Sequence, residues 1–502
     1  MFNRLLINHL SRSKPFCLLG AAGVGKTTLI REFAAKYSNL IHLDFETSAD
    51  RAIFNFEVSP EETLQAVSFL KGADLRGSGT LIVLDEIGKC PQSAKWVSSF
   101  LNGRSESGAG QLTGGREGNR PTRQEAKMEE KSVTKGPFIV AVSSILTPEA
   151  AQLTDAENGC MQPCFLYPCS FEEFLPLMED PAALEAFREV PVPYYAYEKL
   201  LHYFHLYSLV GGMPEITGEY AASRQLAGLR RIYEETEERF IQGLTDVTAG
   251  SRSRDLAAEV LQNTYPFAAT RISFNRFGNL EKGSREIGQA FNSLERAFFL
   301  QLVYPGTSTV LPLASDPTRF PRLQLLDTGL VNYFSGIQKP LFQSHDMNAI
   351  FEGQIARQVV GQEILATAGL QNRQLTAHGS SPGEQSPVYK QEAPYKQEAP
   401  SLHFWTRHKA QSTAEVDFVI RYDDLLIPVV VRSGEPGRLR SLHQFIDLAP
   451  HSYAVRLYAG KLAVQQTQTL RGKKFFLLNL PYFLAGKIGE HLKGFIRLAN
   501  GS

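Results

Sequence analysis

The sequence predicts an α/β protein with a parallel sheet flanked by helices, then a mostly helical region, then a mixed α/β domain. Three observations support this prediction. Short apolar runs alternate with helical patterns over residues 1–180, helical periodicity dominates residues 184–337, and strand patterns return among helices after residue 400. Such alternation is typical of a parallel sheet, because each parallel crossover needs a connecting helix. At 502 residues the chain has room for about three domains.

Each strand predicted in the first region is a short apolar run. Helices are predicted between the runs, as over Glu61–Leu70, which follows the helix-start residue Pro60. Met1–Leu10 has the pattern of a short amphipathic helix. Residues from about 103 to 136 contain few large apolar side chains, which predicts a disordered insertion. The predicted strands are Phe16–Leu19, Leu40–Phe45, Thr80–Leu84, Phe138–Val142 and Phe165–Tyr167.

A glycine-rich loop follows the first predicted strand. Residues 20–27 read Gly-Ala-Ala-Gly-Val-Gly-Lys-Thr and satisfy the phosphate-binding pattern G-x-x-x-x-G-K-[ST]. Backbone N–H groups of such a turn surround phosphates, while Lys26 is placed to reach the β- and γ-phosphate oxygens and Thr27 to bind Mg²⁺. The loop therefore predicts a P-loop NTPase sheet that binds ATP with Mg²⁺. The predicted nucleotide-binding residues are Gly20, Gly23, Gly25, Lys26, Thr27 and Thr28.

Two acidic residues end the third predicted strand. Asp85 and Glu86 follow the apolar run Thr80–Leu84. A carboxylate at the end of a buried strand is the usual partner of a phosphate loop, so Asp85 is predicted to hold Mg²⁺ directly or through water. Glu86 is predicted to polarise the attacking water, a role that hydrolysis requires and a small-molecule kinase does not. The pair therefore favours an ATPase.

The fourth predicted strand, Phe138–Val142, ends in two serines. A polar group at this strand end can sense the γ-phosphate in ATPases with the Asp-Glu pair. Ser143 is therefore predicted as a catalytic residue, with Ser144 as the alternative candidate. The structural alternative is that a serine here caps the next helix.

Composition excludes several classes of protein. No apolar run approaches the roughly 20 residues that cross a bilayer, and the N-terminus lacks the features of a signal peptide, so the predicted location is cytoplasmic. Cys160, Cys164 and Cys169 have no zinc-site spacing and are interpreted as reduced thiols. Lys plus Arg and Asp plus Glu both total 52, so the net charge of the chain does not attract nucleic acid overall. Residues 436–502 carry ten basic and two acidic residues, which suits either a polyanion contact or a solvated surface.

The order of further motifs resembles that of a prokaryotic family of AAA-type ATPases with a C-terminal domain of unknown function. The motifs follow the phosphate loop in the family order and extend over nearly the whole chain. They are Leu84–Ile87, Tyr167–Leu175 (similar to the family's PLSFxEFL), Val210–Glu215 (GGMPE), Leu326–Leu330 (DTGL), Phe351–Glu352 (FEN) and Glu415–Ile420 (EVDFV).

The resemblance implies three modules. Strand patterns near residues 300–304 and 322–326 follow helical patterns, which agrees with a winged helix that contacts DNA or serves as a packing module. A low-complexity insertion with a direct repeat lies at about 371–400. The implied modules are an ATPase core (1–180), a helical lid with a winged-helix region (181–340) and a restriction-endonuclease-like domain (341–502).

The last module departs from what nuclease chemistry needs. Catalysis in restriction-endonuclease-like folds needs an acid at one strand end, then an acid and a lysine two residues apart on the next strand; the carboxylates hold Mg²⁺ and the lysine activates water or stabilises charge. Glu352 and Asp417 are present. Val430, however, replaces the second acid and Arg432 replaces the lysine; valine cannot bind a metal and arginine is too basic to transfer a proton. The site is therefore predicted to be degenerate and nuclease activity lost, with Glu415 the one residue that could substitute as a metal ligand.

A second departure concerns an arginine. Relatives often carry Gly-Arg just before the PLSF segment, where this chain reads Asn158-Gly159-Cys160. If that arginine contributes to catalysis in the family, turnover here is slow or another arginine, such as Arg271, supplies the charge.

Together these features predict a protein that binds and hydrolyses ATP and uses its nucleotide state to control a winged helix and a degenerate nuclease-like module. Two alternatives stay open: a nuclease licensed by ATP, and a non-hydrolysing, nucleotide-dependent interaction or scaffold protein. The predicted partner classes are DNA, through the winged helix or the basic C-terminal segment, and a protein; no membrane partner is predicted.

Overall fold

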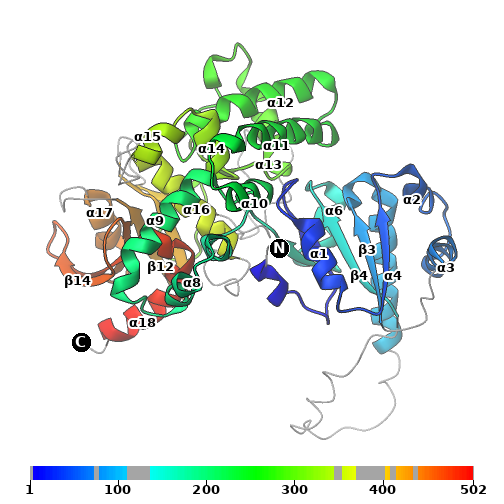
Figure 1. Cartoon of the computed structure of the whole chain (residues 1–502), viewed down its shortest axis with the longest axis horizontal. Helices are drawn as coiled ribbons and strands as arrows, with labels where there is room; N and C mark the ends of the chain where they lie inside the picture. The colour runs from blue at the N-terminus through cyan, green and yellow to red at the C-terminus, as the bar shows by residue number, and fades with distance from the viewer. Residues whose placement is uncertain are drawn as a thin grey trace, which may run out of the picture.

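The N-terminal region is built on a parallel sheet, blue to cyan in Figure 1. Its strand order is β2-β3-β4-β1-β5, so β4 separates the phosphate-loop strand from the strand that ends in the acidic pair. The strands are β1 (Phe16–Leu19), β2 (Asn39–Asp44), β3 (Thr80–Asp85), β4 (Phe138–Ser143) and β5 (Gln162–Phe165). The computed structural model describes residues 4–72, 79–109, 136–343, 353–368, 402–407, 414–432 and 439–500.

Both faces of this sheet are buried, because alternate side chains of each strand enter different cores. Leu81 and Val83 pack on the side of α1 (Lys26–Ala34), whereas Ile82 and Leu84 pack on the other side. A parallel sheet covered on both faces has continuous apolar strands, which explains the runs in the sequence. The remaining helices here are η1 (Leu5–Asn8), α2 (Ser48–Ala52), α3 (Pro60–Lys71), η2 (Ile87–Lys89), α4 (Pro91–Ala109) and α6 (Pro148–Leu153).

The predicted α/β class is confirmed, but three predicted boundaries are wrong. The fifth strand, β5, begins at Gln162 rather than Phe165; it pairs only with β1 at the sheet edge, where Pro163, which lacks an N–H, is tolerated. The predicted short amphipathic helix is present as the 3-10 helix η1, which buries Leu6 and Ile7 but covers only four residues. α4 continues to Ala109, so the start of the predicted insertion is helical, and residues 110–135 lie outside the described residues.

The middle region, green in Figure 1, is mainly helical, as predicted. α13 (Ser284–Arg296) precedes the antiparallel pair β6 (Leu300–Val303) and β8 (Arg322–Leu325), so helices are followed by two strands where a winged helix is predicted. The other helices are α7 (Phe171–Phe174), η3 (Leu175–Met178), α8 (Pro181–Arg188), η4 (Tyr194–Ala196), α9 (Tyr197–Val210), α10 (Pro214–Ser223), η5 (Ala227–Leu229), α11 (Arg230–Gly243), η6 (Leu244–Asp246), α12 (Ser251–Thr264), η7 (Tyr265–Phe267), η8 (Phe277–Asn279), α14 (Thr328–Phe334) and α15 (Gln338–Gln343).

The C-terminal region contains a mixed five-stranded sheet in the order β11-β12-β13-β15-β14, orange to red in Figure 1. The three central strands are parallel, and each outer strand is antiparallel to its neighbour. Sequence patterns missed β14, because this edge strand is mostly polar and exposed. The elements are β11 (Phe418–Tyr422), β12 (Leu425–Val431), α17 (Arg440–Leu448), β13 (Tyr453–Tyr458), β14 (Ala463–Gln468), β15 (Lys474–Pro481), η12 (Tyr482–Lys487) and α18 (Ile488–Asn500).

A second small sheet joins the middle and C-terminal regions. The EVDFV-like motif Glu415–Ile420 forms two strands separated at Asp417: β10 (Glu415–Val416) pairs with β9 (Phe404–Thr406), while β11 pairs with β12. β9 also pairs with β7 (Pro305–Gly306). The predicted boundary at residue 340 therefore divides elements that share a sheet, and it stays a prediction.

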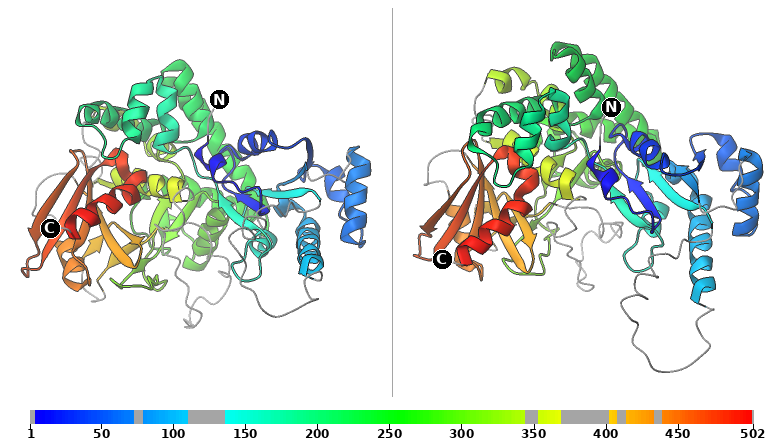
Figure 2. Two further views of the ribbon diagram at one scale, coloured as in Figure 1. Left: turned by 90° about the horizontal axis from the view of Figure 1, so that it is seen from below. Right: turned by 60° about the horizontal axis from the view of Figure 1, so that its bottom comes forward.

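One helix, α16 (Gln354–Ala368), lies between the two large sheets (yellow in Figures 1 and 2). It contacts β8, α14, β12 and η12, and both its apolar and its polar side chains are buried. A helix buried on all sides must satisfy its polar groups internally. Gln358 does so by accepting from the Leu325 N–H (3.2 Å) and donating to the Leu325 carbonyl (2.8 Å).

Among the helices of the described residues, none is both long and apolar enough to cross a membrane.

Candidate functional site

The phosphate loop connects β1 to α1 and depends on its glycines. Gly25 is the N-cap of α1 and has φ +96°, a left-handed conformation that favours glycine. A Cβ atom at Gly20 would collide with the carbonyl oxygen of Leu166, which follows the neighbouring strand β5. The backbone of this loop thus requires glycine for geometric reasons at two of the predicted positions.

Lys26 folds back onto its own loop. Its side chain is buried, and Nζ donates to the carbonyls of Gly20 (2.8 Å) and Ala21 (3.0 Å) and to Ser144 Oγ (2.8 Å). Burial lowers the pKa of Lys26, and the charges of Glu86 and Asp85 oppose this shift. All three donors of the ammonium group are therefore engaged, and a phosphate must replace loop partners when it binds.

Glu86 is held by the end of β4. Its Oε2 accepts from the Ser144 N–H (3.0 Å), and its Oε1 accepts from the Ser144 hydroxyl. The Glu86 backbone is left-handed, with φ 52°, which is uncommon for a residue with a side chain and turns the carboxylate toward β4. A continuous hydrogen-bonded chain therefore runs from Lys26 through Ser144 to Glu86.

The two serines at this strand end have different surroundings. The Ser143 hydroxyl is fully buried and donates to the Ile145 carbonyl (2.7 Å), so it closes the bend after β4. Ser144 is the serine that contacts both Lys26 and Glu86. The prediction of Ser143 as the catalytic serine is therefore not supported by the geometry, because its hydroxyl is used locally; Ser144, the alternative, lies in the site.

Asp85 lies beside Glu86 and has a partner that the sequence did not indicate. Its Oδ1 accepts from the Glu86 N–H (3.1 Å), and its Oδ2 lies 3.1 Å from Nε2 of His42 on β2. This hydrogen bond raises the pKa of His42, so protonation of His42 and the negative charge of Asp85 support each other. Strands β2 and β3 are parallel and pair Asp44 with Asp85, so His42, two residues before Asp44 on the same face, is a diagonal neighbour of Asp85.

The predicted nucleotide residues converge at one edge of the sheet. All its strands are parallel, so the loop after β1, the acidic pair after β3 and the serine after β4 share the carboxyl edge. Thr27 and Thr28 lie exposed in the first turn of α1. A hydroxyl and a carboxylate oxygen near a lysine suit Mg²⁺ and a triphosphate, since Mg²⁺ prefers oxygen ligands. The individual roles of these residues stay predictions.

A buried arginine forms a hydrogen bond to the backbone of the phosphate loop. Arg4 is 3% exposed; its Nη1 donates to the Val24 carbonyl (2.7 Å) and its Nη2 to the Tyr167 carbonyl (2.6 Å). Its Nε donates to Glu173 Oε1 (3.1 Å). Arg4 thereby connects the phosphate loop to the Tyr167–Leu175 motif, and no pattern in the sequence pointed to it.

Replacement of Arg4 by alanine is expected to lower the free energy of unfolding by about 3–5 kcal/mol, because it leaves the buried Glu173 carboxylate without its cation. Arg12→Ala, on the same N-terminal segment but exposed, is the matched control and should change stability by less than about 0.5 kcal/mol. Thermal and urea unfolding measure both variants. Equal stability of the two would show that Arg4 does not hold this junction.

The loop between α9 and α10 covers the phosphate loop. A Cβ at Gly23 would lie 3.2 Å from Met213 Cε, and one at Gly25 would lie 3.6 Å from Pro214 Cγ. The same segment is fixed from the other side, since the Gly212 N–H donates to Asp327 Oδ2 (2.6 Å). The GGMPE-like motif therefore packs between the nucleotide loop and the DTGL-like motif.

A buried polar relay continues from Asp327 into α16. Gln362 Nε2 lies 3.4 Å from Asp327 Oδ2, and Gln362 Oε1 accepts from both the N–H and the hydroxyl of Thr328 (2.8 Å each). Burial raises the pKa of Asp327 to about 6. Glu363, next on α16, accepts from the Phe171 N–H (2.9 Å) and the Tyr207 hydroxyl (2.7 Å). We use the name buried relay for Asp327, Gln362 and Glu363.

Stability should depend on pH through Glu363. Burial raises its pKa to about 7 from an ordinary 4.5, so between these values the native state holds a proton that the unfolded chain releases. The resulting stabilisation is complete at low pH and is lost as pH rises through about 7. Glu363→Gln, which carries no charge, is expected to melt higher than the wild type at pH 8 and to lose this advantage at pH 5. Glu189→Gln, which changes an exposed residue, should show no pH-dependent difference.

Two further contacts connect the nucleotide edge to the middle region. Lys89, in η2 directly after Glu86, lies 3.2 Å from Asp246 at the end of η6. Leu146, two residues after Ser144, exchanges two hydrogen bonds with the end of α13: its N–H donates to the Arg296 carbonyl (2.8 Å), and Arg296 Nε donates to the Leu146 carbonyl (3.2 Å). The segments that follow the acidic pair and the serine thus each contact the predicted lid.

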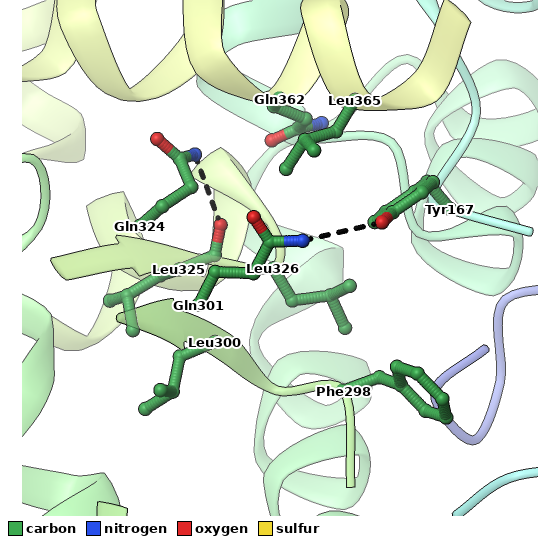
Figure 3. Close-up of a pocket in the computed structure, with 9 residues that line it drawn as sticks. All are labelled: Tyr167, Phe298, Leu300, Gln301, Gln324, Leu325, Leu326, Gln362 and Leu365. Atoms are coloured by element: carbon green, nitrogen blue, oxygen red, sulfur yellow. Dashed lines mark hydrogen bonds between the residues drawn. The ribbon is translucent and has the colours of Figure 1, made fainter. Parts of the chain in front are cut away.

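A small cavity lies between β6, β8, α16 and the start of the PLSF-like motif (Figure 3). Gln301 Nε2 crosses it to the Tyr167 hydroxyl at 3.3 Å. Its volume of about 20 Å³ admits a water molecule and excludes a nucleotide. The lining residues are Tyr167, Phe298, Leu300, Gln301, Gln324, Leu325, Leu326, Gln362 and Leu365.

The predicted degenerate site is partly visible. Asp417 is 1% exposed, accepts from the Val431 N–H (2.8 Å) and lies 3.2 Å from Arg432 Nη1, so the structure brings these two predicted residues together. Val430 is buried in a core with Trp405. Glu352 lies outside the described residues. Within the described part of the chain, no group of three or more His, Cys, Asp or Glu could hold a metal ion.

Glu415 and Arg271 each have partners outside the roles considered for them. Glu415 pairs with Arg322, which donates through Nη2, and with Arg271 at 3.3 Å. Its carboxylate is therefore held by cations rather than presented to a metal. Arg271 is placed beside Glu415 and the ring of Phe404, so in this arrangement it does not supply a positive charge to the phosphate loop.

Three family models match parts of the chain. An AAA domain matches residues 12–130, a domain of unknown function (DUF8612) matches residues 201–341, and another (DUF4143) matches residues 388–483. Among solved structures, the chain is similar to the Aeropyrum pernix ORC1 protein in complex with DNA, with 13% identity, coverage of 67% of this chain and 90% of that chain, and a TM-score of 0.25. No curated protein matches the chain. The matched AAA domain contains both the phosphate loop and the acidic pair.

Proposed function

We propose that this chain, which combines an AAA-type P-loop ATPase domain with two C-terminal domains of unknown function, hydrolyses ATP and uses its nucleotide state to control those domains. The observation that supports hydrolysis is the hydrogen-bonded chain from Lys26 through Ser144 to Glu86. A group that recognises phosphate and a carboxylate that can accept a proton are thereby joined through one hydroxyl.

In the proposed reaction, Lys26 exchanges loop carbonyls for β- and γ-phosphate oxygens. Ser144, which now bridges Lys26 and Glu86, turns its hydroxyl toward the γ-phosphate. Glu86 is then free to orient the attacking water and accept its proton, while the water oxygen bonds to the γ-phosphorus and the bond from that phosphorus to the bridging oxygen breaks, so that ADP leaves. Thr27 and Asp85 are the residues that would hold Mg²⁺, which when bound neutralises charge on the phosphates. His42 positions Asp85 for this role.

The proposed control follows three contacts from the nucleotide edge. Lys89, which follows Glu86 in the chain, contacts Asp246, so a movement of Glu86 would be transmitted to Asp246. Leu146, which follows Ser144, contacts Arg296 in the same way. The phosphate loop packs against Met213. The neighbouring Gly212 donates to Asp327, from which the buried relay continues to α16. Each contact joins a segment that changes partners in the reaction to a helix outside the ATPase core.

Phosphate release at saturating MgATP tests the catalytic half of this proposal. Hydrogen exchange of α13 and α16, with a non-hydrolysable ATP analogue and without nucleotide, tests the control half; slower exchange in both helices with the analogue is expected. Nucleotide binding without any phosphate release would instead favour a non-hydrolysing interaction or scaffold protein. Phosphate release together with unchanged hydrogen exchange in α13 and α16 would show that the protein hydrolyses ATP without the proposed control.

The alternative of an ATP-licensed nuclease makes a different prediction. Because Asp417 is occupied by Arg432 and the Val431 N–H, we expect plasmid DNA to stay intact with ATP and Mg²⁺ or Mn²⁺. Gel electrophoresis after prolonged incubation measures this. Cleavage that disappears in Asp417→Ala would establish the alternative. DNA contact through the winged helix or residues 436–502 is a separate proposal that this assay leaves open.

A further inference from the structure

The segment that connects α9 to α10 is held by hydrogen bonds on both sides of its backbone. The Gly212 N–H donates to Asp327 Oδ2 (2.6 Å), and the Gly212 carbonyl accepts from the Cys169 N–H (2.7 Å). The preceding Gly211 has φ +89°, a conformation that favours glycine. Both polar backbone groups of Gly212 are therefore occupied. We call residues 211–214 the bracing loop.

The bracing loop packs directly on the first turn of α14. A Cβ atom at Gly211 would collide with Asp327 Oδ1, and one at Gly329 would collide with the Val210 carbonyl oxygen. Glycine at both positions lets the two segments approach without an intervening side chain. The position of the bracing loop therefore depends on α14 and on the residue that caps it.

The other side of the bracing loop contacts the phosphate loop. A Cβ atom at Gly23 would lie 3.2 Å from Met213 Cε, and one at Gly25 would lie 3.6 Å from Pro214 Cγ. A Cβ at Gly25 would also lie 3.6 Å from Arg4 Nη1, and the Met213 side chain is buried. The phosphate loop is thus enclosed between Arg4, which comes from the N-terminal segment, and the bracing loop, which comes from the middle region.

Asp327 uses its two carboxylate oxygens for different purposes. Oδ1 accepts from the Leu330 N–H (3.1 Å) and so caps α14. Oδ2 accepts from the Gly212 N–H, across 115 residues of sequence, and lies 3.4 Å from Gln362 Nε2. Hydrogen bonds to an ionised carboxylate are short and strong. The first oxygen stabilises its own helix, whereas the second acts on the bracing loop.

We propose that Asp327 is a positioning residue of the nucleotide site. Through Gly212 it holds the bracing loop against the phosphate loop and keeps that loop in its phosphate-binding shape before ATP arrives. This inference rests on the proposed function, because that function assigns ATP to the phosphate loop. A loop that is already ordered loses less conformational freedom when it binds its ligand, so Asp327 acts on nucleotide affinity. Among the described residues no hydrogen bond joins Asp327 to Glu86, so the chemical step does not depend on it.

Asp327→Ser separates the two roles of this side chain. Serine has a single oxygen, which can cap α14, and the Gly212 N–H loses its acceptor. Calorimetry measures the affinities for MgATP and MgADP, and both are expected to fall about tenfold. The rate of phosphate release at saturating MgATP should stay within about threefold of the wild-type rate. A general loss of structure would lower affinity and rate together.

Hydrogen exchange without nucleotide measures the order of the phosphate loop directly. The peptide that contains residues 20–30 is expected to exchange faster in Asp327→Ser than in the wild type. Asn332→Ala is the matched control, because Asn332 is also buried on α14 and its Nδ2 donates to the Ser208 carbonyl of α9 (2.7 Å). This variant removes a contact between the same two helices, and it should leave both nucleotide affinity and the exchange of residues 20–30 unchanged.

Met213→Ala removes the contact with the phosphate loop and leaves Asp327 intact. It should reproduce the effects on affinity and exchange, and it decides the test if Asp327→Ser does not fold. Unchanged affinity and exchange in folded Asp327→Ser, or equal changes in Asn332→Ala, would overturn the positioning role. Absence of nucleotide binding by the wild type would instead disprove the proposed function, and the exchange measurement would still decide whether Asp327 orders the loop.

Discussion

Replacement of Lys26 by alanine is expected to abolish tight binding of MgATP, with an affinity loss of at least about 100-fold. Two charge-assisted hydrogen bonds to phosphate would be lost, each worth about 1.5–3 kcal/mol. Part of this is offset in the wild type, because Lys26 first gives up the carbonyls of Gly20 and Ala21. Equilibrium titration with a fluorescent ATP analogue measures the change directly.

Two controls are needed for this experiment. Loss of Lys26 also leaves the buried Ala21 carbonyl and the Ser144 hydroxyl without a donor, so the melting temperature must show that the variant is folded. Lys95→Ala removes the same charge from an exposed position on α4 and should leave affinity unchanged. Wild-type affinity in a folded Lys26→Ala protein would disprove the nucleotide site.

Replacement of Glu86 by glutamine is expected to lower the rate of phosphate release by about 100-fold or more while MgATP affinity stays within about threefold. Glutamine retains an oxygen that can accept from the Ser144 N–H, so the geometry of the loop is kept. It cannot accept a proton from water. Single-turnover hydrolysis, together with the binding titration, separates the chemical step from affinity.

Glu32→Gln, an exposed position on α1, makes the same chemical change away from the carboxyl edge and should hydrolyse ATP at the wild-type rate. If Glu86→Gln and wild type release phosphate equally fast, Glu86 is not the base. The proposed release of Glu86 by Ser144 gives a further expectation within this experiment. Ser144→Ala should bind MgATP and release phosphate at an altered rate, whereas Ser143→Ala should mainly change the stability of the fold.

The convergence of the predicted nucleotide residues at one sheet edge could be predicted because local sequence rules determine it. The turn between β1 and α1 needs glycine at Gly20 and Gly25, and an apolar strand that ends in acids places Asp85 at the same sheet edge. Consecutive residues of one strand end cannot be distinguished in this way. Ser143 and Ser144 are adjacent, and only the bend at Ile145 decides which hydroxyl faces Lys26.

Long-range polar contacts had no signal in the sequence. Arg4 binds three partners that lie between 20 and 169 residues away, and Glu363 meets the Phe171 N–H across 192 residues. Such pairs depend on how the modules pack, and the periodicity of the sequence does not indicate them. The ion pairs of Glu415 are of the same kind, since Arg271 and Arg322 come from the middle region and Glu415 from the C-terminal one.

Helix α16 carries Arg357, which lies 3.9 Å from Asp417 beside the C-terminal sheet, and Glu363 of the buried relay, six residues and about 9 Å apart along its axis. A single helix therefore contacts both the C-terminal sheet and the support of the phosphate loop. If ATP shifts this helix, a closed thermodynamic cycle applies: whatever factor ATP imposes on the affinity of a ligand for the C-terminal domain, that ligand must impose on ATP affinity. Measuring both factors in one protein would give the strength of this linkage twice, from opposite ends of the same helix.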